Sequence, residues 1–60
     1  MTDVIQKLRF KFTGGSLEEF LNTAMSLGLS RGEADSLFKM LLREGKLALD
    51  PAGDWRWTDG

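Results

Sequence analysis

The side chains most capable of binding chemistry lie in the middle of the chain. Ser36, Lys39 and Arg43 recur at intervals of three and four residues, which places them on one face of a helix. Lysine and arginine on such a face can contact phosphates, and arginine can also reach guanine edges in the major groove of a duplex. The candidate nucleic-acid-binding residues are Arg31, Ser36, Lys39, Arg43, Lys46 and Arg56.

Acidic residues lie close enough to this basic face to weaken its potential. Glu33, Asp35 and Glu44 flank it, and a solvated helix surface commonly carries the same mixture of charges. The whole chain has a net charge of -1, from 8 Lys and Arg against 9 Asp and Glu. This balance argues against strong nonspecific binding of nucleic acid, which needs many phosphate contacts.

Catalysis is not indicated by the carboxylates of the chain. Glu18 and Glu19 diverge on a helix surface, Glu33 resembles a helix cap, and Asp50 and Asp54 flank a turn. Histidine and cysteine are both absent, which removes imidazole bases, thiolate nucleophiles and the usual zinc ligands. The sequence therefore predicts a protein that is not an enzyme and has no catalytic residues, metal or cofactor.

The basic face requires a helix over residues 30–44. Ser30 and Glu33 form a capping-box pattern at its start, and Gly45 provides its stop. The apolar residues Ala34, Leu37, Phe38, Leu41 and Leu42 fall on one arc and are predicted to face the core. The opposite arc is predicted to be exposed and carries Gly32, Ser36, Lys39, Met40 and Arg43.

A second helix is predicted just before this one. Ser16 and Glu19 repeat the capping-box pattern, so the helix should begin at Leu17 and end near Leu27, with Gly28 as its C-terminal cap. Its buried stripe comprises Leu17, Phe20, Leu21, Ala24 and Met25. The tight connection from 27 to 30 predicts a helix-turn-helix.

The first fifteen residues allow two interpretations. Val4, Ile5, Leu8 and Phe12 have helical spacing, which predicts a helix over residues 3–12. Residues 8–13 also alternate between apolar and polar side chains, so a short strand competes with its last turns. The helical spacing is more extensive, and a helix is the prediction.

The C-terminal residues predict a two-stranded hairpin. Leu47 and Leu49 share one strand face, and Trp55 and Trp57 share one face of the partner strand. The segment 50–54 contains a proline and a glycine suited to a turn. At least one tryptophan is expected to cover the core, with Arg56 pointing the other way.

Three helices followed by a hairpin define a mainly α fold, a winged helix-turn-helix with a two-stranded wing. Residues 1–60 are predicted to form a single winged-helix domain, with a short strand near residues 13–15 possible beside the wing. Besides one tryptophan, the predicted core is Ile5, Leu8, Phe12, Leu17, Phe20, Leu21, Ala24, Leu37, Phe38, Leu41 and Leu47.

Several segments of the sequence are similar to the corresponding segments of one protein family. They are Phe12 to Glu19, Ala24, Leu27 to Ser30, Leu42 to Leu47, Asp50-Pro51 and Gly53 to Trp55. Over nearly its whole length the chain resembles the C-terminal winged-helix domain of archaeal minichromosome maintenance (MCM) replicative helicases. The resemblance implies an accessory to a hexameric ATPase that has no ATPase motif, binds DNA weakly or not at all, and modulates the helicase or contacts origin-recognition proteins. The wing departs from a phosphate-binding one because it is acidic at Asp50 and Asp54.

Three functions remain open from the sequence. The leading one is a noncatalytic module of a DNA-replication helicase, monomeric in isolation, with weak DNA contact and regulatory contact with replication proteins. The alternatives are a freestanding transcriptional regulator that binds duplex DNA, and a pure protein-interaction domain. The chain has no apolar run long enough to span a bilayer and no cysteine, so an intracellular location in the cytoplasm or nucleoid is expected, with no membrane contact.

Overall fold

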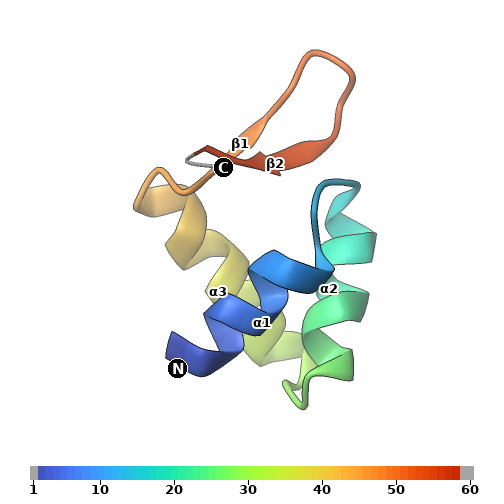
Figure 1. The fold of residues 1–60 in the computed structure, drawn as a ribbon, viewed down its shortest axis with the longest axis vertical. Helices are drawn as coiled ribbons and strands as arrows, with labels where there is room; N and C mark the ends of the chain where they lie inside the picture. Colours follow the sequence, from blue (N-terminus) through green and yellow to red (C-terminus); the bar gives the residue numbers. More distant parts are fainter. Residues whose placement is uncertain (1, 59–60) are drawn as a thin grey trace.

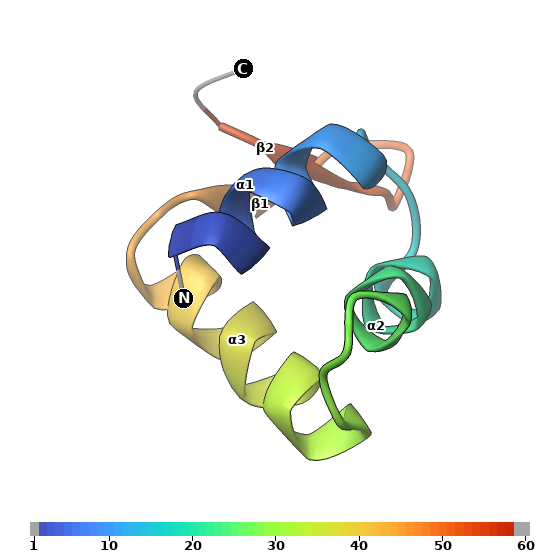
Figure 2. The same ribbon diagram turned by 60° about the horizontal axis from the view of Figure 1, so that its bottom comes forward.

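The computed structural model describes residues 2–58 as three helices followed by a β-hairpin (Figure 1). The elements are α1 (Thr2–Lys11), α2 (Leu17–Ser26), α3 (Arg31–Arg43), β1 (Leu47–Leu49) and β2 (Trp55–Trp57). Turned by 60°, the three helices enclose a common interior, with the hairpin at one end of α3 (Figure 2). The architecture is mainly α with a small β-hairpin, the layout of a winged helix-turn-helix, as the sequence predicts.

The α1 segment is a helix, and the competing strand interpretation of residues 8–13 is wrong. The helical hydrogen bonding continues to its end, where the Phe12 N–H donates to the Leu8 carbonyl at 2.7 Å. Leu8 and Phe12, four residues apart on one side of the helix, are both buried. Phe10, which belonged only to the strand pattern, is 87% exposed.

The connection between α2 and α3 is the tight turn that the caps predict. At α3 the capping box is complete: the Glu33 N–H donates to Ser30 Oγ at 3.1 Å, and the Ser30 N–H donates to Glu33 Oε1 at 2.9 Å. At α2 only half of the predicted box exists among the described residues, since the Glu19 N–H donates to Ser16 Oγ at 3.2 Å without the reciprocal bond. The Glu19 carboxylate lies against the Gly15 Cα instead.

A single bridge joins the turn after α1 to the wing. In the antiparallel hairpin Leu47 pairs with Trp57 and Leu49 pairs with Trp55. On the other side of Trp55, the Trp55 N–H donates to the Gly15 carbonyl at 2.7 Å, and the Gly15 N–H donates back at 3.2 Å. The short strand suggested near residues 13–15 is thus one bridging residue, Gly15.

The core joins all three helices and β1. Its buried residues are Leu8, Phe12, Phe20, Leu21, Ala24, Ala34, Leu37, Phe38, Leu41 and Leu47. Two core predictions need correction: Ile5 is only partly buried, and Leu17 is 38% exposed at the first turn of α2. Ala34 is buried, as its place on the core-facing arc of α3 predicts. Both tryptophans pack partly buried against this cluster.

The aromatic side chains form a connected series through the core. The ring of Phe20 makes edge-on contacts with Phe12 and with Phe38, both at 5.3 Å between centroids, and Phe38 contacts Trp55 at 4.9 Å. This series fixes the wing against the helices. Within residues 2–58, no helix combines the length and the apolar character needed to cross a membrane.

Candidate nucleic-acid interface

The outer face of α3 carries three predicted binding residues together. Ser36, Lys39 and Arg43 are all exposed, on the side opposite the buried stripe of the helix. Lys39 Nζ lies 3.1 Å from Asp35 Oδ2, one turn earlier on the same helix. The charge of Lys39 is therefore partly compensated before any ligand arrives.

Arg31 is also engaged by a carboxylate. Its Nη2 lies 3.6 Å from Glu18 Oε2, so this pair links the start of α3 to α2. Both side chains are 64% exposed, and such an exposed pair contributes little to stability. The pair does lower the cationic character of the N-terminal end of the face.

The basic side chains whose charge is least compensated by nearby carboxylates lie at the C-terminal end of α3. Arg43 in its last turn and Lys46 just after it are exposed, and within residues 2–58 neither forms an ion pair. Glu44 is the nearest acidic residue in sequence. The positive potential of the candidate interface is thus concentrated where α3 leads into β1.

The N-terminal end of α3 carries a fixed negative charge. The backbone N–H of Ser30, and secondarily the Ser30 hydroxyl, lower the pKa of the Glu33 carboxyl below its ordinary value of 4.5. A carboxylate at this position also interacts favourably with the positive end of the helix dipole. Glu33 is therefore ionised at neutral pH and repels phosphate from the first turn of α3.

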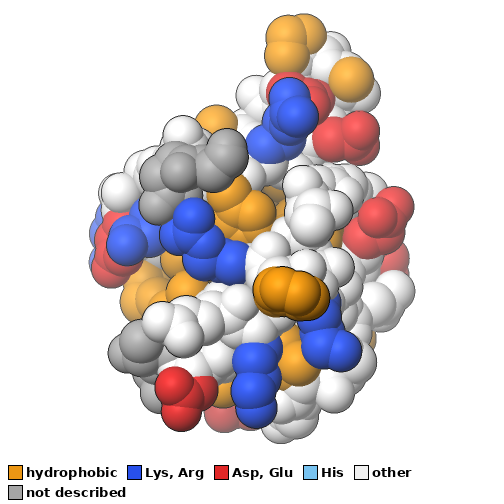
Figure 3. Space-filling model, in the orientation of Figure 1, with side chains coloured by type: hydrophobic (Ala, Val, Ile, Leu, Met, Phe, Trp, Pro, Cys, Tyr) orange, Lys and Arg blue, Asp and Glu red, His pale blue; other side chains and the backbone are white. Residues whose placement is uncertain are grey.

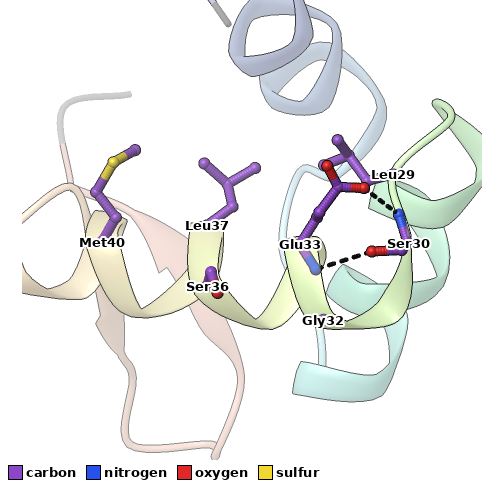
Figure 4. A pocket seen from close by; sticks show the side chains of 7 residues that line it. All are labelled: Leu29, Ser30, Gly32, Glu33, Ser36, Leu37 and Met40. Atoms are coloured by element: carbon purple, nitrogen blue, oxygen red, sulfur yellow. Dashed lines mark hydrogen bonds between the residues drawn. The ribbon is translucent and has the colours of Figure 1, made fainter.

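An apolar hollow of about 580 Å³ runs along the same end of α3 (Figure 4). The hollow receives the side chains of Leu29, Leu37 and Met40, which project into it on one side of the helix. The opposite side of the hollow is lined by Gly32 and Ser36. Met40 was predicted to lie on the exposed arc, but it is half-buried and packs against the core. The sequence signal for this feature was present, since Met40 is the one large apolar side chain on that arc.

Arg56 lies apart from the other candidates. It lines a second hollow, of about 450 Å³, together with Arg9, Thr13 and Trp57. None of these residues belongs to α3, so the structure does not join Arg56 to the α3 face. Arg9 and Thr13 are not among the candidate binding residues predicted from sequence, and nothing in local spacing relates either of them to Arg56, more than forty positions later.

Basic side chains also gather on the face of the molecule that carries α1. Lys and Arg side chains surround a protruding hydrophobic group there (Figure 3). Phe10 is the most exposed large hydrophobic side chain described. Lys7, which is also exposed, lies one turn before Phe10, and the exposed Lys11 lies one turn after Lys7. The cationic surface is therefore divided between α3 and α1.

No group of side chains placed to bind a metal is present in the part of the chain that the structure describes. Residues 2–58 contain no group of three or more histidine, cysteine or acidic side chains that could hold a metal ion. No polar or charged side chain is buried among these residues.

Comparisons with protein-family models, with curated proteins and with solved structures gave no match for this chain.

Proposed function

We propose that the chain is a noncatalytic winged-helix module of a DNA-replication helicase, which contacts duplex DNA weakly through the outer face of α3. The observation that carries the DNA contact is the exposure of Arg43 and Lys46, which form no ion pair within residues 2–58, together with the exposed Ser36 two turns before Arg43. In helix-turn-helix domains the second helix of the motif enters the major groove. The resemblance to the C-terminal domain of archaeal MCM helicases supports the assignment to replication. This role implies an intracellular location, in the cytoplasm or nucleoid.

The charges of the α3 face set the strength of this contact. Two of its cations, Arg31 and Lys39, are already paired with carboxylates, and Glu33 is ionised in its first turn. Two cations, Arg43 and Lys46, remain for phosphate contacts, so the logarithm of the binding constant should fall with the logarithm of the salt concentration at a slope of about -2. Such a domain binds as an accessory that relies on a larger assembly for its affinity.

A protein partner is the second candidate, favoured by the apolar hollow. Gly32, in the first turn of α3, and Ser36, one turn later, open onto a space lined by Leu29, Leu37 and Met40. An apolar groove of this kind suits the apolar side of a partner helix better than a phosphate backbone. Regulatory contact with helicase or origin-recognition proteins fits this surface.

NMR titration with duplex and single-stranded DNA tests the proposal. We expect amide shifts at Ser36, Lys39 and Arg43, a monomer throughout, and loss of most of the duplex response in Arg43→Gln. Lys7→Gln removes the same charge from α1 and is the matched control. Absence of shifts on α3 would remove the DNA contact and leave the protein partner. Dimerisation with tight binding to one duplex sequence would instead identify a freestanding regulator.

A further inference from the structure

Two exposed surfaces of the molecule complement each other in shape and charge. One is the α1 patch, made of Lys7, Phe10 and Lys11, in which an exposed ring is accompanied by two exposed lysines. The other is the apolar hollow at the N-terminal end of α3, the α3 hollow, with a volume of about 580 Å³. They belong to different helices, so each could contact the other on a second copy of the chain.

The α1 patch offers an apolar side chain with a positive charge one turn away. Phe10 is 87% exposed, so burying its ring would remove a large apolar surface from water. Within residues 2–58 neither Lys7 nor Lys11 forms an ion pair. Asp3, one turn before Lys7, is acidic but is not paired with it. Both lysines are therefore able to pair with a carboxylate of another molecule.

The α3 hollow offers an apolar wall with one carboxylate beside it. Leu29, Leu37 and Met40 project into the hollow, and Glu33 lies on the same side of the helix (Figure 4). Glu33 Oε1 accepts from the Ser30 N–H at 2.9 Å, which holds the carboxylate in place. A carboxylate has two oxygens, so Oε2 is left to accept from a ligand.

The charges around the α3 hollow favour a cationic occupant. Arg31 is compensated by Glu18 at 3.6 Å, and Lys39 is compensated by Asp35 at 3.1 Å. Glu33 forms no ion pair within residues 2–58, and its lowered pKa keeps it ionised at neutral pH. An apolar side chain with a positive charge close by is therefore complementary to this hollow.

The spacing of the two surfaces also matches. Lys7 and Phe10 are three residues apart on α1, and Glu33 and Leu37 are four residues apart on α3. The two separations along the helix axes are about 4.5 and 6 Å. When the two helices lie parallel with Lys7 against Glu33, the Phe10 ring faces Leu37 and Met40.

We propose that the α1 patch of one copy docks into the α3 hollow of a second copy. Because the two surfaces differ, the contact is head-to-tail and can extend to further copies. A contact of a few side chains is far smaller than the interfaces of about 1,200 Å² or more that stable complexes bury. We expect a dissociation constant on the order of 1 mM, so the chain is a monomer at the tens of micromolar used for DNA titrations. The contact needs no DNA and is tested independently of the function proposed above.

NMR spectra and sedimentation of the chain without DNA, from tens of micromolar to a few millimolar, test the contact. We expect amide shifts that grow with concentration at Phe10, Leu37 and Met40, together with faster sedimentation. Phe10→Ser should weaken the association by about tenfold or more, because the ring is no longer buried. Leu49→Ser removes a side chain that is 56% exposed on the wing, and as the matched control it should change nothing. Spectra that stay constant with concentration, or equal effects of the two variants, would overturn the proposal and leave the hollow to a helix of another protein.

A mixture of two variants tests whether the contact is head-to-tail. Phe10→Ser retains the α3 hollow, whereas Ser36→Arg retains the α1 patch but places a cation at the edge of the hollow. With circular dichroism intact in both, neither variant should associate alone. An equal mixture should form pairs and no longer species, with shifts on α3 of the first variant and on α1 of the second. Association of Ser36→Arg with itself, or shifts of the same surface on both copies, would overturn the proposal.

Discussion

Glu33 is the residue whose ionisation is coupled most directly to folding. Its pKa is lower in the folded chain than the ordinary value of 4.5, because the Ser30 backbone N–H and, secondarily, the Ser30 hydroxyl favour the carboxylate. A group with a depressed folded pKa stabilises the folded state above its unfolded pKa. This stabilisation is therefore complete above about pH 4.5 and is lost as the pH falls through the folded pKa.

The variant Glu33→Gln isolates this effect. Glutamine keeps an oxygen that can accept the Ser30 N–H bond but cannot ionise. We expect the wild-type chain to be more stable than Glu33→Gln at pH 7, and the two stabilities to converge as the pH falls below about 4.5. Urea unfolding followed by tryptophan fluorescence from pH 7 to pH 3 measures the difference, and a difference that is constant across this range would contradict the coupling.

Two glycines at the α2–α3 turn should respond in opposite ways to alanine. Gly28 has a φ of +104°, which L side chains rarely adopt, whereas Gly32 lies in the first turn of α3 with no atom within 4 Å of an added Cβ. We expect Gly28→Ala to lower the free energy of unfolding by about 1–2 kcal/mol and Gly32→Ala to raise it by about 0.5–1 kcal/mol. Urea titrations of both variants check this, and destabilisation by Gly32→Ala would show that the hollow beside it cannot accept a methyl group.

At the scale of elements, Phe38 connects α3 to the wing. Its ring contacts Phe20 and Trp55 edge-on, at 5.3 and 4.9 Å. Phe38→Leu keeps an apolar side chain but removes both aromatic pairs and some buried volume, so we expect a loss of about 1–3 kcal/mol and a weaker near-ultraviolet circular dichroism signal from tryptophan. Phe10→Leu, at a side chain that is 87% exposed, is the control and should stay within about 0.5 kcal/mol. Equal losses of stability in Phe38→Leu and Phe10→Leu would show that the contacts between the aromatic rings contribute nothing beyond the size of the side chains.

The helices could be predicted from sequence because their signals are local. The complete capping box of α3 needs only Ser30 and Glu33, which are three residues apart. The depth of burial could not be predicted in the same way. Helical spacing places Leu17 on the correct side of α2, but it lies at the first turn, beyond the edge of the core, and remains 38% exposed.

The binding surfaces depended on contacts between distant segments. The bridge between Gly15 and Trp55 and the hollow that joins Arg9 to Arg56 each bring together residues about forty or more positions apart. No periodicity encodes such a pairing, because it is decided by how the wing packs on α1. The sequence therefore identifies Arg56 as a candidate on the wing, but it does not predict that Arg56 shares a hollow with Arg9 and Thr13.

At the scale of the whole molecule, size and charge limit what the domain can do alone. Its radius of gyration is 10.4 Å, which matches about 10.4 Å expected for a compact domain of this length. Its net charge of -1 provides no long-range attraction for nucleic acid. Any approach to a phosphate backbone must therefore depend on how the charges are distributed over α3, α1 and the wing.

The acidic wing is the part of this distribution that opposes DNA binding through α3. Asp54 is exposed in the hairpin loop, where a winged-helix domain docked through α3 brings its wing near the backbone. Asp54→Asn removes one repulsion, and at separations near a Debye length we expect duplex affinity to rise by about twofold at low salt. Asp3→Asn makes the same change in net charge at the exposed first turn of α1, which belongs neither to α3 nor to the wing, and should have less effect. Fluorescence anisotropy with a labelled duplex measures the affinity of both variants.

Equal gains of affinity in Asp54→Asn and Asp3→Asn would mean that only the total charge matters. No gain in Asp54→Asn would mean that the wing stays clear of the duplex.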